Sequence, residues 1–485
     1  MASSRVARGS ALLRWLEREG CEHSVTLGTT PSAGVGVFAS RDVGKGEVLV
    51  SCPMRCVIGA AETRRGDADD ETVAFQDAMD ALRVADGSGD SPGSDDDREG
   101  TPVSDSTRMQ LVLLRERNLA ETEEKNIGCD DAATTTKDSQ EEPRRGGYWR
   151  HYVASLPGND LVACLPLSWS GVDLRRRLHG TALLFETSAD LAELKCLQKA
   201  LAKNQKEFPP ETFNLDALIW AHAVFWSRAI SLPQAGWGRA GEGCHNKKQK
   251  TEKRTAGDDG ALTPLLDMCN HSSFSHTELR RRGARWQLVA RRGFKKDEQV
   301  TIDYGGKGNG ELLRRHGFVV PLNPYDTCSA WVSSDITIGF ASSDDENPKR
   351  AEKIKILLHR GTKQWNEFPG GLDVLLRGFD AKHVSDVVQD VDEGLTTAIG
   401  NVDFEKKFDQ DALRRLEAQA ARMADAISIS DDEKHSLAGN EDDDDQKSGF
   451  ESTPGHFADR AALLYRTSQR ELLLDLKELA ETRRR

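Results

Sequence analysis

The chain has 485 residues, of which 37% are hydrophobic and 30% are charged, and its formal net charge is −13. This length allows two or three domains, each with a core of its own. The acidic balance argues against a dedicated nucleic-acid-binding protein, which is usually basic, so no nucleic-acid partner is predicted. No segment approaches the roughly 20 apolar residues that a membrane-spanning helix requires, so no membrane partner is predicted either.

The cysteines and the first residues indicate the compartment. The nine cysteines are an odd number at irregular spacing, which is typical of free thiols in a reducing environment. The start of the chain lacks the apolar stretch of a secretory signal and is short for a transit peptide. These features predict a cytoplasmic or nuclear protein, with an organelle address left open.

The first part of the chain reads as short strands between turns. After an amphipathic helix beginning at Ala11, the stretch "SVTLGTTPSAGVGVFASRDVGKGEVLVSCP" has turn residues between apolar runs. These runs predict three strands, at Val25–Thr29, Gly36–Ala39 and Glu47–Cys52. A helical pattern follows near Thr72–Val84, and then an acidic low-complexity run at 86–105, which has too few apolar groups to offset its ordering entropy.

Helical patterns dominate the middle of the chain. Apolar residues at helical spacing predict helices in three segments, residues 107–119, 187–208 and 212–232. A polar insert at 120–147 follows the first of them, and the basic loop His245–Arg254 follows the last.

Beyond the basic loop the pattern returns to strands. "RWQLVARRGF" and "EQVTIDYG" are strand-like, and "NGELLRRHGF" predicts a short helix that ends at Gly317. From Pro324 onward one strand-like stretch, "SAWVSSDITIGF", is followed by mostly helical patterns, the last over Phe457–Glu481. A second acidic run, "DDEKHSLAGNEDDDDQKS", interrupts this part, which we expect to form a separate helical domain.

The stretch "PLLDMCNHSSF" crowds several reactive side chains into a few residues. Asp267, Cys269 and His271 alternate, so an extended segment would place them on one face, as a metal site could require. No Cys-x-x-Cys pair supplies further ligands, and adjacent residues of one strand do not form a nucleophile with its base. Taken alone, Cys269 reads as a structural thiol and His271 as a packed histidine.

"GVGVFA" formally matches a dinucleotide-binding fingerprint. That motif requires a helix after its glycines, whereas "SRDVGKGEVLV" predicts another strand. We therefore interpret this stretch as a glycine-rich hairpin whose backbone can approach a ligand closely.

Four fragments in order carry a more specific signal: "AGVGVFASRDVGKGEVL", "FWSRAISLP", "LLDMCNHS" and "EQVTIDYGGKGNGELLRRHGF". Together they resemble the SET-domain methyltransferases, in the branch of the plant Rubisco large-subunit lysine methyltransferase and the animal actin-histidine methyltransferase. "YWRHYVASLP" is similar to the helical insert of that branch, and "RAALLYRTSQRELLLDL" to its substrate-binding domain.

The resemblance implies a fold class and a division of the chain. The class is α+β, with a β-rich SET catalytic core split by a helical insert and followed by a mostly helical C-terminal substrate-binding domain. The implied segments are a catalytic domain at 11–318 (core parts 23–60 and 220–318, insert 107–219, low-complexity run 86–105) and a substrate-binding domain at 325–485.

The implied cofactor is S-adenosylmethionine. Its contacts would come from three segments of the chain: Ala33, Gly34 and Val35 in the hairpin, then Arg228, and then Asn270 with His271. The planar fork of an arginine suits the carboxylate of the cofactor, and an asparagine amide offers both donors and an acceptor. The alternative for Arg228 is a structural ion pair.

The implied acceptor side includes Tyr304 at the methyl-transfer channel, as the catalytic residue. Ile230, Asp267 and His316 map onto positions that contact the protein substrate. Two departures stand out, since Ala33 replaces a frequent acidic residue and His316 replaces a tyrosine. No cysteine cluster follows "RRHGF", so the resemblance implies no zinc or other metal and lowers the histone-tail interpretation.

The implied function is S-adenosylmethionine-dependent N-methylation of a lysine in a non-histone protein. Ile230 favours lysine, because the histidine-modifying enzyme of the branch carries an asparagine there that can bond an imidazole. "DMCNH" is itself closer to that histidine enzyme. Two alternatives therefore stay open, a histidine acceptor and a non-catalytic SET-like protein that recruits partners.

Overall fold

The structure, a computed structural model, describes residues 2–30, 34–60, 63, 70–84, 100–127, 147–230, 260–272, 274–321, 323, 325–333, 353–359, 373–378, 410–433 and 454–484. The basic loop, most of both acidic runs and most of the polar insert lie outside the described residues. The chain divides into two compact units, the first formed by Met1–Val162 and Asp190–Gly305, the second by Ala163–Ala189 and Gly306–Arg485. Within the described ranges, no helix has the length and apolar content needed to span a membrane.

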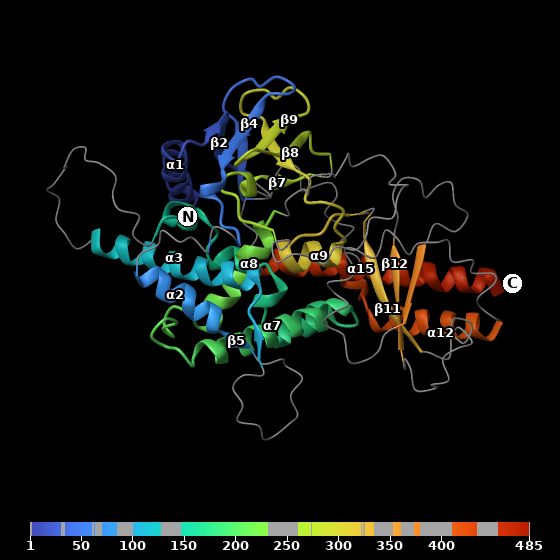
Figure 1. Ribbon diagram of the computed structural model, residues 1–485. Helices are drawn as coiled ribbons and strands as arrows, with labels where there is room; N and C mark the ends of the chain where they lie inside the picture. The colour runs from blue at the N-terminus through green and yellow to red at the C-terminus, as the bar shows by residue number, and fades with distance from the viewer. Residues whose placement is uncertain are drawn as a thin grey trace. The chain divides into compact units, whose positions relative to one another are not determined.

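The first unit contains two four-stranded sheets, whose labelled strands lie at the top of Figure 1, above helices α2, α3 and α8. One has the order β1-β4-β9-β8 and is antiparallel throughout. The other has the order β2-β3-β10-β7, and its last pair, β10 with β7, is parallel. The bounds are β1 (Glu22–His23), β4 (Val48–Pro53), β9 (Arg285–Ala290), β8 (Thr277–Arg282), β2 (Val25–Thr30), β3 (Gly34–Ala39), β10 (Gln299–Ile302) and β7 (Asn270–His271).

The strands predicted in the glycine-rich region and in the two strand-like stretches before Gly305 are confirmed. Strand β8 was not predicted, because its sequence "TELRRR" shows no alternation of apolar with polar residues. Most of β8 is exposed at the edge of its sheet, where charged side chains need no apolar partner face.

Helices accompany these sheets within the first unit. Their bounds are α1 (Ala2–Arg18), α2 (Asp70–Ala81), α3 (Asp105–Ile127), α4 (Arg150–Ser155), α5 (Asn159–Val162) and α8 (Leu215–Arg228), while α7 (Ala182–Leu201) begins in the second unit. The helix predicted to reach Val84 ends at Ala81, because Arg83 and Val84 instead form strand β5 and pair with β6 (Thr101–Pro102).

Helix α4 is held in place by a buried carboxylate. The side chain of Glu116, on α3, accepts hydrogen bonds from the backbone N–H of Gly147 at 3.2 Å and of Trp149 at 3.1 Å. These donors stand just before the first turn of α4, where no intrahelical partner exists for them. Burial raises the pKa of Glu116 to about 7 in spite of these two bonds. The contact fixes where α4 begins and therefore where Tyr152 points.

The second unit combines helices with a small sheet. Its helices are α6 (Gly171–Leu178), α9 (Asn309–Glu311), which continues into a π-helical turn η5 (Leu312–His316), α12 (Gln410–Ala426) and α15 (Pro454–Arg484). Helices α12 and α15 run side by side (Figure 1). An antiparallel sheet has the order β11 (Thr327–Ser333), β12 (Lys353–His359) and β13 (Asp373–Gly378). The sequence predicts a strand at β11, whereas it predicts mostly helical structure for the part of the chain that contains β12 and β13.

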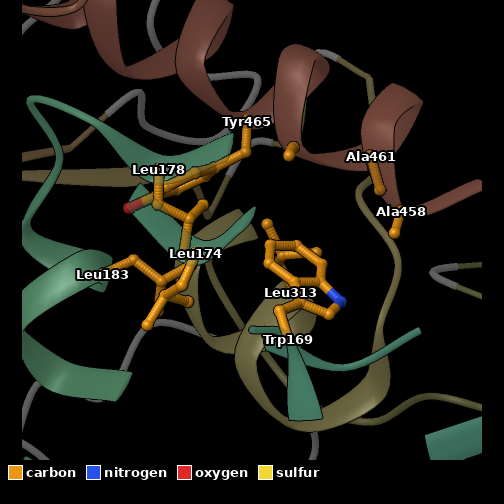
Figure 2. Close-up of a cluster of buried hydrophobic side chains, with 9 residues drawn as sticks. Trp169, Leu174, Leu178, Leu183, Leu313, Ala458, Ala461 and Tyr465 are labelled. Carbon is orange, nitrogen blue, oxygen red and sulfur yellow. The ribbon is translucent and has the colours of Figure 1, made fainter. Parts of the chain in front are cut away.

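A cluster of buried apolar side chains forms the core of the second unit (Figure 2). The cluster contains Trp169, Leu174, Leu178, Leu183, Leu313, Ala458, Ala461, Ala462 and Tyr465. The alanines of α15 let this helix approach the leucines of α6, while Arg177 covers the ring of Trp169 at 4.6 Å. The predicted α+β class, with a β-rich core split by helices and a mostly helical C-terminal part, is confirmed.

Gly180 is required by its backbone and by its surroundings. It has φ +75°, and a Cβ there would lie 2.4 Å from the carbonyl oxygen of Ala426. We expect Gly180→Ala to lower the free energy of unfolding by about 2–4 kcal/mol, from the left-handed backbone and the clash together. Gly317→Ala is the matched control in the same unit, with φ +78° but its nearest atom at 3.4 Å. Urea denaturation should show the larger loss for Gly180→Ala, and equal losses would contradict the clash.

Candidate active site at the strand junction of the first unit

The site forms where the parallel strands β7 and β10 meet. Thr301 pairs with Asn270 and Ile302 with His271, so the sequence "NH" lies directly beside the end of β10. Strand β10 also pairs with β3, which carries the glycines of the hairpin. The pairing thus brings three of the four sequence fragments into one sheet.

Tyr304 follows β10 and folds back over the "DMCNH" stretch. Its hydroxyl donates a hydrogen bond to the carbonyl oxygen of Cys269 at 3.0 Å. Its backbone N–H donates to Nδ1 of His271 at 3.2 Å, and the two rings lie 5.1 Å apart. Tyr304 is half-buried, and burial raises its pKa to about 12, so the phenol stays protonated at neutral pH.

His271 acts as an acceptor in this arrangement. Because Nδ1 accepts the N–H of Tyr304, the neutral ring carries its proton on Nε2. Burial lowers the pKa of His271, although Asp303, at 3.9 Å, opposes that effect. The ring therefore remains neutral at neutral pH and fixes the backbone at Tyr304.

Asn270 presents a polar group that the described residues leave unused. Its Nδ2 atom is buried and has no hydrogen-bond partner in the described part of the chain. This amide can approach the strand closely only because residue 36 is glycine, since a Cβ at that position would lie 2.8 Å from Nδ2. A buried donor without a partner is costly unless a ligand supplies an acceptor.

Gly34 begins β3 at the hairpin end. It has φ +70°, a conformation that favours glycine, and none of the described residues lies within 4 Å of the place where its Cβ would stand. Val35 is half-buried and pairs with Thr29 of β2. Ala33, which the sequence also assigned to the cofactor, lies outside the described residues.

Arg228, the last residue of α8, contacts Asp267. Its Nη1 donates to the backbone carbonyl of Asp267 at 3.0 Å and lies 3.8 Å from the carboxylate Oδ1. The ion pair that the sequence left open as an alternative is therefore present. Both of these contacts are made through Nη1 of the guanidinium.

The carboxylate of Asp267 is enclosed. Its side chain has 0% exposure, and the hydroxyl of Tyr152, on α4, donates a short hydrogen bond to Oδ2. Burial raises the pKa of Asp267 to about 7, against the lowering effect of Arg228 and of the Tyr152 hydrogen bond. The sequence does not predict this contact of Tyr152, because the two partners are 115 residues apart and no local pattern links them.

The backbone before this segment is strained. Leu265 has φ 73°, which is unusual for a residue with a branched side chain. It precedes the 3-10 turn η4 (Leu266–Met268), whose residues are all buried. Strain of this kind collects at functional sites, where the surrounding structure holds it in place.

Two further residues that the sequence assigned to the substrate side are Ile230 and His316. Ile230 is half-buried and forms an isolated antiparallel bridge with Ala261. His316 ends the π-helical turn in the second unit, with its ring 6.0 Å from that of Phe318. Among the described residues, no group of three or more His, Cys, Asp or Glu side chains is arranged to hold a metal ion.

The buried carboxyl of Asp267 should make stability depend on pH. Its folded pKa of about 7 exceeds the unfolded value of about 3.9. The folded protein therefore binds more protons than the unfolded chain between these values, and stability falls as pH rises through that window. We expect Asp267→Asn to reduce the fall in the free energy of unfolding across this window by about 2–4 kcal/mol. Some pH dependence of stability should remain in Asp267→Asn, because burial raises the pKa of Glu116 as well.

Urea denaturation at several pH values from about 5 to about 8 measures this dependence. An unchanged pH slope in Asp267→Asn would show that the carboxyl titrates normally.

Comparisons with known proteins agree on one family. A model described as "SET domain" matches residues 34–305. A ribosomal lysine N-methyltransferase of Schizosaccharomyces pombe is 31% identical over 134 residues, which cover 26% of this chain and 20% of the relative. An actin-histidine N-methyltransferase of Dasypus novemcinctus is 24% identical over 223 residues, which cover 44% of this chain and 33% of the relative. The chain thus spans between a fifth and a third of these relatives.

The fold also has solved counterparts. The structure of Rubisco LSMT bound to AdoMet matches with a TM-score of 0.58 and 18% sequence identity, covering 98% of this chain and 92% of that one. At this identity the likeness concerns the fold.

Proposed function

The chain belongs to the SET-domain family, and from that premise we propose that it is a protein N-methyltransferase that uses S-adenosylmethionine. We further propose that its acceptor is a lysine of a non-histone protein. The observation that carries the proposal is the buried amide of Asn270, which has no hydrogen-bond partner among the described residues and lies close against Gly36.

The residues at this junction fit the proposed cofactor. S-Adenosylmethionine carries an amino acid end with a carboxylate, which calls for a fixed cation and nearby hydrogen-bonding groups. Arg228 supplies a fixed guanidinium, and Asn270 has a buried amide with no partner among the described residues, which also place nothing within 4 Å of a Cβ at Gly34. In this proposal Arg228 would hold the carboxylate, while Asn270 and the backbone at His271 and Gly34 would hold the rest.

When bound, the cofactor supplies a methyl group on a cationic sulfur. The task of the protein is then to align an attacking nitrogen with that group. Tyr304 is placed for this, because its hydroxyl and the carbonyl oxygen of Cys269 lie together at the end of the strand pair. These two oxygens would receive the N–H groups of the incoming amine and orient its lone pair.

The protein does not use Tyr304 as a base. A phenol whose pKa is raised to about 12 does not form phenolate at neutral pH, and the ring of His271 is committed to the backbone of Tyr304. A lysine must therefore lose its proton before transfer. Entry into a site with little water disfavours the ammonium form and assists that loss.

The choice of lysine rests on Ile230. Its apolar side chain cannot donate to or accept from an imidazole, so a histidine acceptor would lose a hydrogen bond there. The histidine alternative draws support from "DMCNH" and from the relatives named actin-histidine N-methyltransferases. Ile230, Asp267 and His316 remain predictions as substrate contacts.

Acid hydrolysis of a labelled target separates the two acceptors. The protein is incubated with a cell extract and S-adenosylmethionine labelled in its methyl group, and the hydrolysate is resolved into methylated amino acids. Label in methyllysine supports the proposal, whereas label in methylhistidine alone would replace lysine by histidine.

A titration of S-adenosylmethionine into the purified protein tests the cofactor assignment against the non-catalytic alternative. We expect saturable binding that is lost in Gly36→Val, because the new side chain fills the space beside Asn270. Gly283→Ala, in a turn with nothing within 4 Å of its Cβ, is the matched control and should bind normally. A wild-type protein that binds neither S-adenosylmethionine nor S-adenosylhomocysteine would refute the proposed function.

A further inference from the structure

Tyr152 lies on helix α4, and its side chain reaches Asp267 in the candidate site. It is 0% exposed, and its hydroxyl donates to Oδ2 of Asp267. The other carboxylate oxygen, Oδ1, has no hydrogen bond in the described ranges and lies 3.8 Å from Nη1 of Arg228. One carboxylate thus stands between a tyrosine and an arginine.

This arrangement restrains Arg228 through its Nη1 atom. Nη1 is occupied by the backbone carbonyl of Asp267 at 3.0 Å and faces Oδ1. A carboxylate that rotated about its own axis would change its distance from Nη1, and the hydroxyl on Oδ2 prevents that rotation. Both contacts of Nη1 are thus made with Asp267, whose carboxylate is bonded in turn by Tyr152.

We propose that Tyr152 is a positioning residue, which orients Arg228 for an anionic ligand by holding the buried carboxylate of Asp267. The anionic group that Arg228 would bind is the carboxylate of S-adenosylmethionine, so this inference rests on the proposed function. It makes helix α4 part of the binding machinery, although no residue of α4 has to contact the cofactor.

The competing account is a core tyrosine that only satisfies a buried carboxylate. Under that account, loss of the hydroxyl lowers stability and leaves ligand affinity unchanged. The positioning account requires the loss to appear in affinity, and to depend on Asp267. The charged or titratable groups near this carboxylate are Arg228 of α8, Tyr152 of α4, and Cys269 and Tyr304 of the strand junction.

The first measurement compares Tyr152→Phe with Tyr148→Phe by calorimetric titration of S-adenosylmethionine. Tyr148 is the matched control. It lies four residues before Tyr152 in the chain, and its hydroxyl donates to Glu19 at 2.8 Å instead of to Asp267. We expect Tyr152→Phe to weaken binding by about tenfold, since a buried charged acceptor loses its donor. Tyr148→Phe should stay within about twofold of the wild type.

The second measurement repeats the titration in an Asp267→Asn background. If Tyr152 acts through Asp267, the tenfold loss should shrink to about twofold or less there. An undiminished loss would show that Tyr152 acts by another route and would overturn the inference. So would Tyr152→Phe affinity equal to that of the wild type.

A third measurement does not need a bound cofactor. In protein labelled with ¹⁵N-arginine, the Nε–H signal of Arg228 is assigned by its absence in Arg228→Lys. We expect Tyr152→Phe and Asp267→Asn to shift or broaden this signal, and Tyr148→Phe to leave it in place. Asp267→Asn serves as the second variant if Tyr152→Phe does not fold.

The NMR measurement separates the two hypotheses. A wild-type protein that binds no S-adenosylmethionine, but whose Arg228 signal responds to Tyr152→Phe, would refute the proposed function and retain the positioning role. An Arg228 signal that is identical in all three variants and the wild type would refute the positioning role itself.

Discussion

Tyr304→Phe should lower the turnover of methyl transfer by roughly 10²-fold while leaving S-adenosylmethionine affinity within about twofold. The substitution removes one hydroxyl and almost no volume. That hydroxyl lies 3.0 Å from the carbonyl oxygen of Cys269, where the acceptor nitrogen would be oriented. A contact of this kind matters most in the transition state, so its loss should appear in kcat rather than in cofactor binding.

The measurement is a time course of methylation on one purified target, with cofactor affinity measured in parallel. Tyr148→Phe is again the control, because it removes a hydroxyl bonded to Glu19 instead. A Tyr304→Phe protein that methylates at the wild-type rate and to the same degree would remove the tyrosine from the mechanism. Stability should change by only about 1 kcal/mol, from the lost hydrogen bond.

Arg228→Met should reduce S-adenosylmethionine affinity by about 10²-fold or more and also destabilise the fold. The methionine keeps part of the side-chain volume and removes the charge. Affinity falls because the cofactor carboxylate loses a charge-assisted partner. Stability falls by about 3–5 kcal/mol at pH 8, because Asp267, with 0% side-chain exposure, becomes a buried charge without its cation.

Two further measurements separate these effects. Arg228 holds the pKa of Asp267 below the value that burial alone would give, so its removal raises that pKa further. The folded carboxyl is then protonated over a wider range, and the stability loss should be smaller at about pH 5 than at pH 8. The double variant Arg228→Met/Asp267→Asn should recover stability and should not recover affinity. Recovery of both would show that Arg228 has only a structural role.

The sequence predicts the local parts of this fold well for identifiable physical reasons. The glycine-rich hairpin was predictable because Gly34 and Gly46 meet the positive φ that their turns require, and the flanking runs are apolar. The helix ending at Gly317 was predictable because a left-handed glycine closes it. These signals lie within a few residues of the structure they specify.

Other parts of the fold depend on distant partners. The segment "KIKILLH" of β12 has an apolar run that suits a helix or a strand, and pairing with β11 and β13 decides the outcome. The sequence of strand β8 has no apolar face that would predict a strand, and pairing with β9 sets its register. In both segments tertiary pairing overrides the local pattern.

The candidate site likewise has a part that the sequence predicts and a part that depends on distant partners. The order of the fragments predicts that the hairpin and the "NH" sequence belong to one site, and β10 does pair with both β3 and β7. The enclosure of Asp267 by Tyr152 could not be predicted, since a carboxylate beside a strand reads equally well as a substrate contact. Only the packing of α4 shows that its side chain is enclosed.

The most direct test of the account is methyl transfer itself. Wild-type protein and Tyr304→Phe are incubated with S-adenosylmethionine labelled in its methyl group and with the same fractionated cell extract. The account predicts that wild-type protein places label on protein lysine, and that the variant does so roughly 10²-fold more slowly. Absence of labelled protein with the wild type, in extracts where an unrelated protein methyltransferase labels its own target, would contradict it.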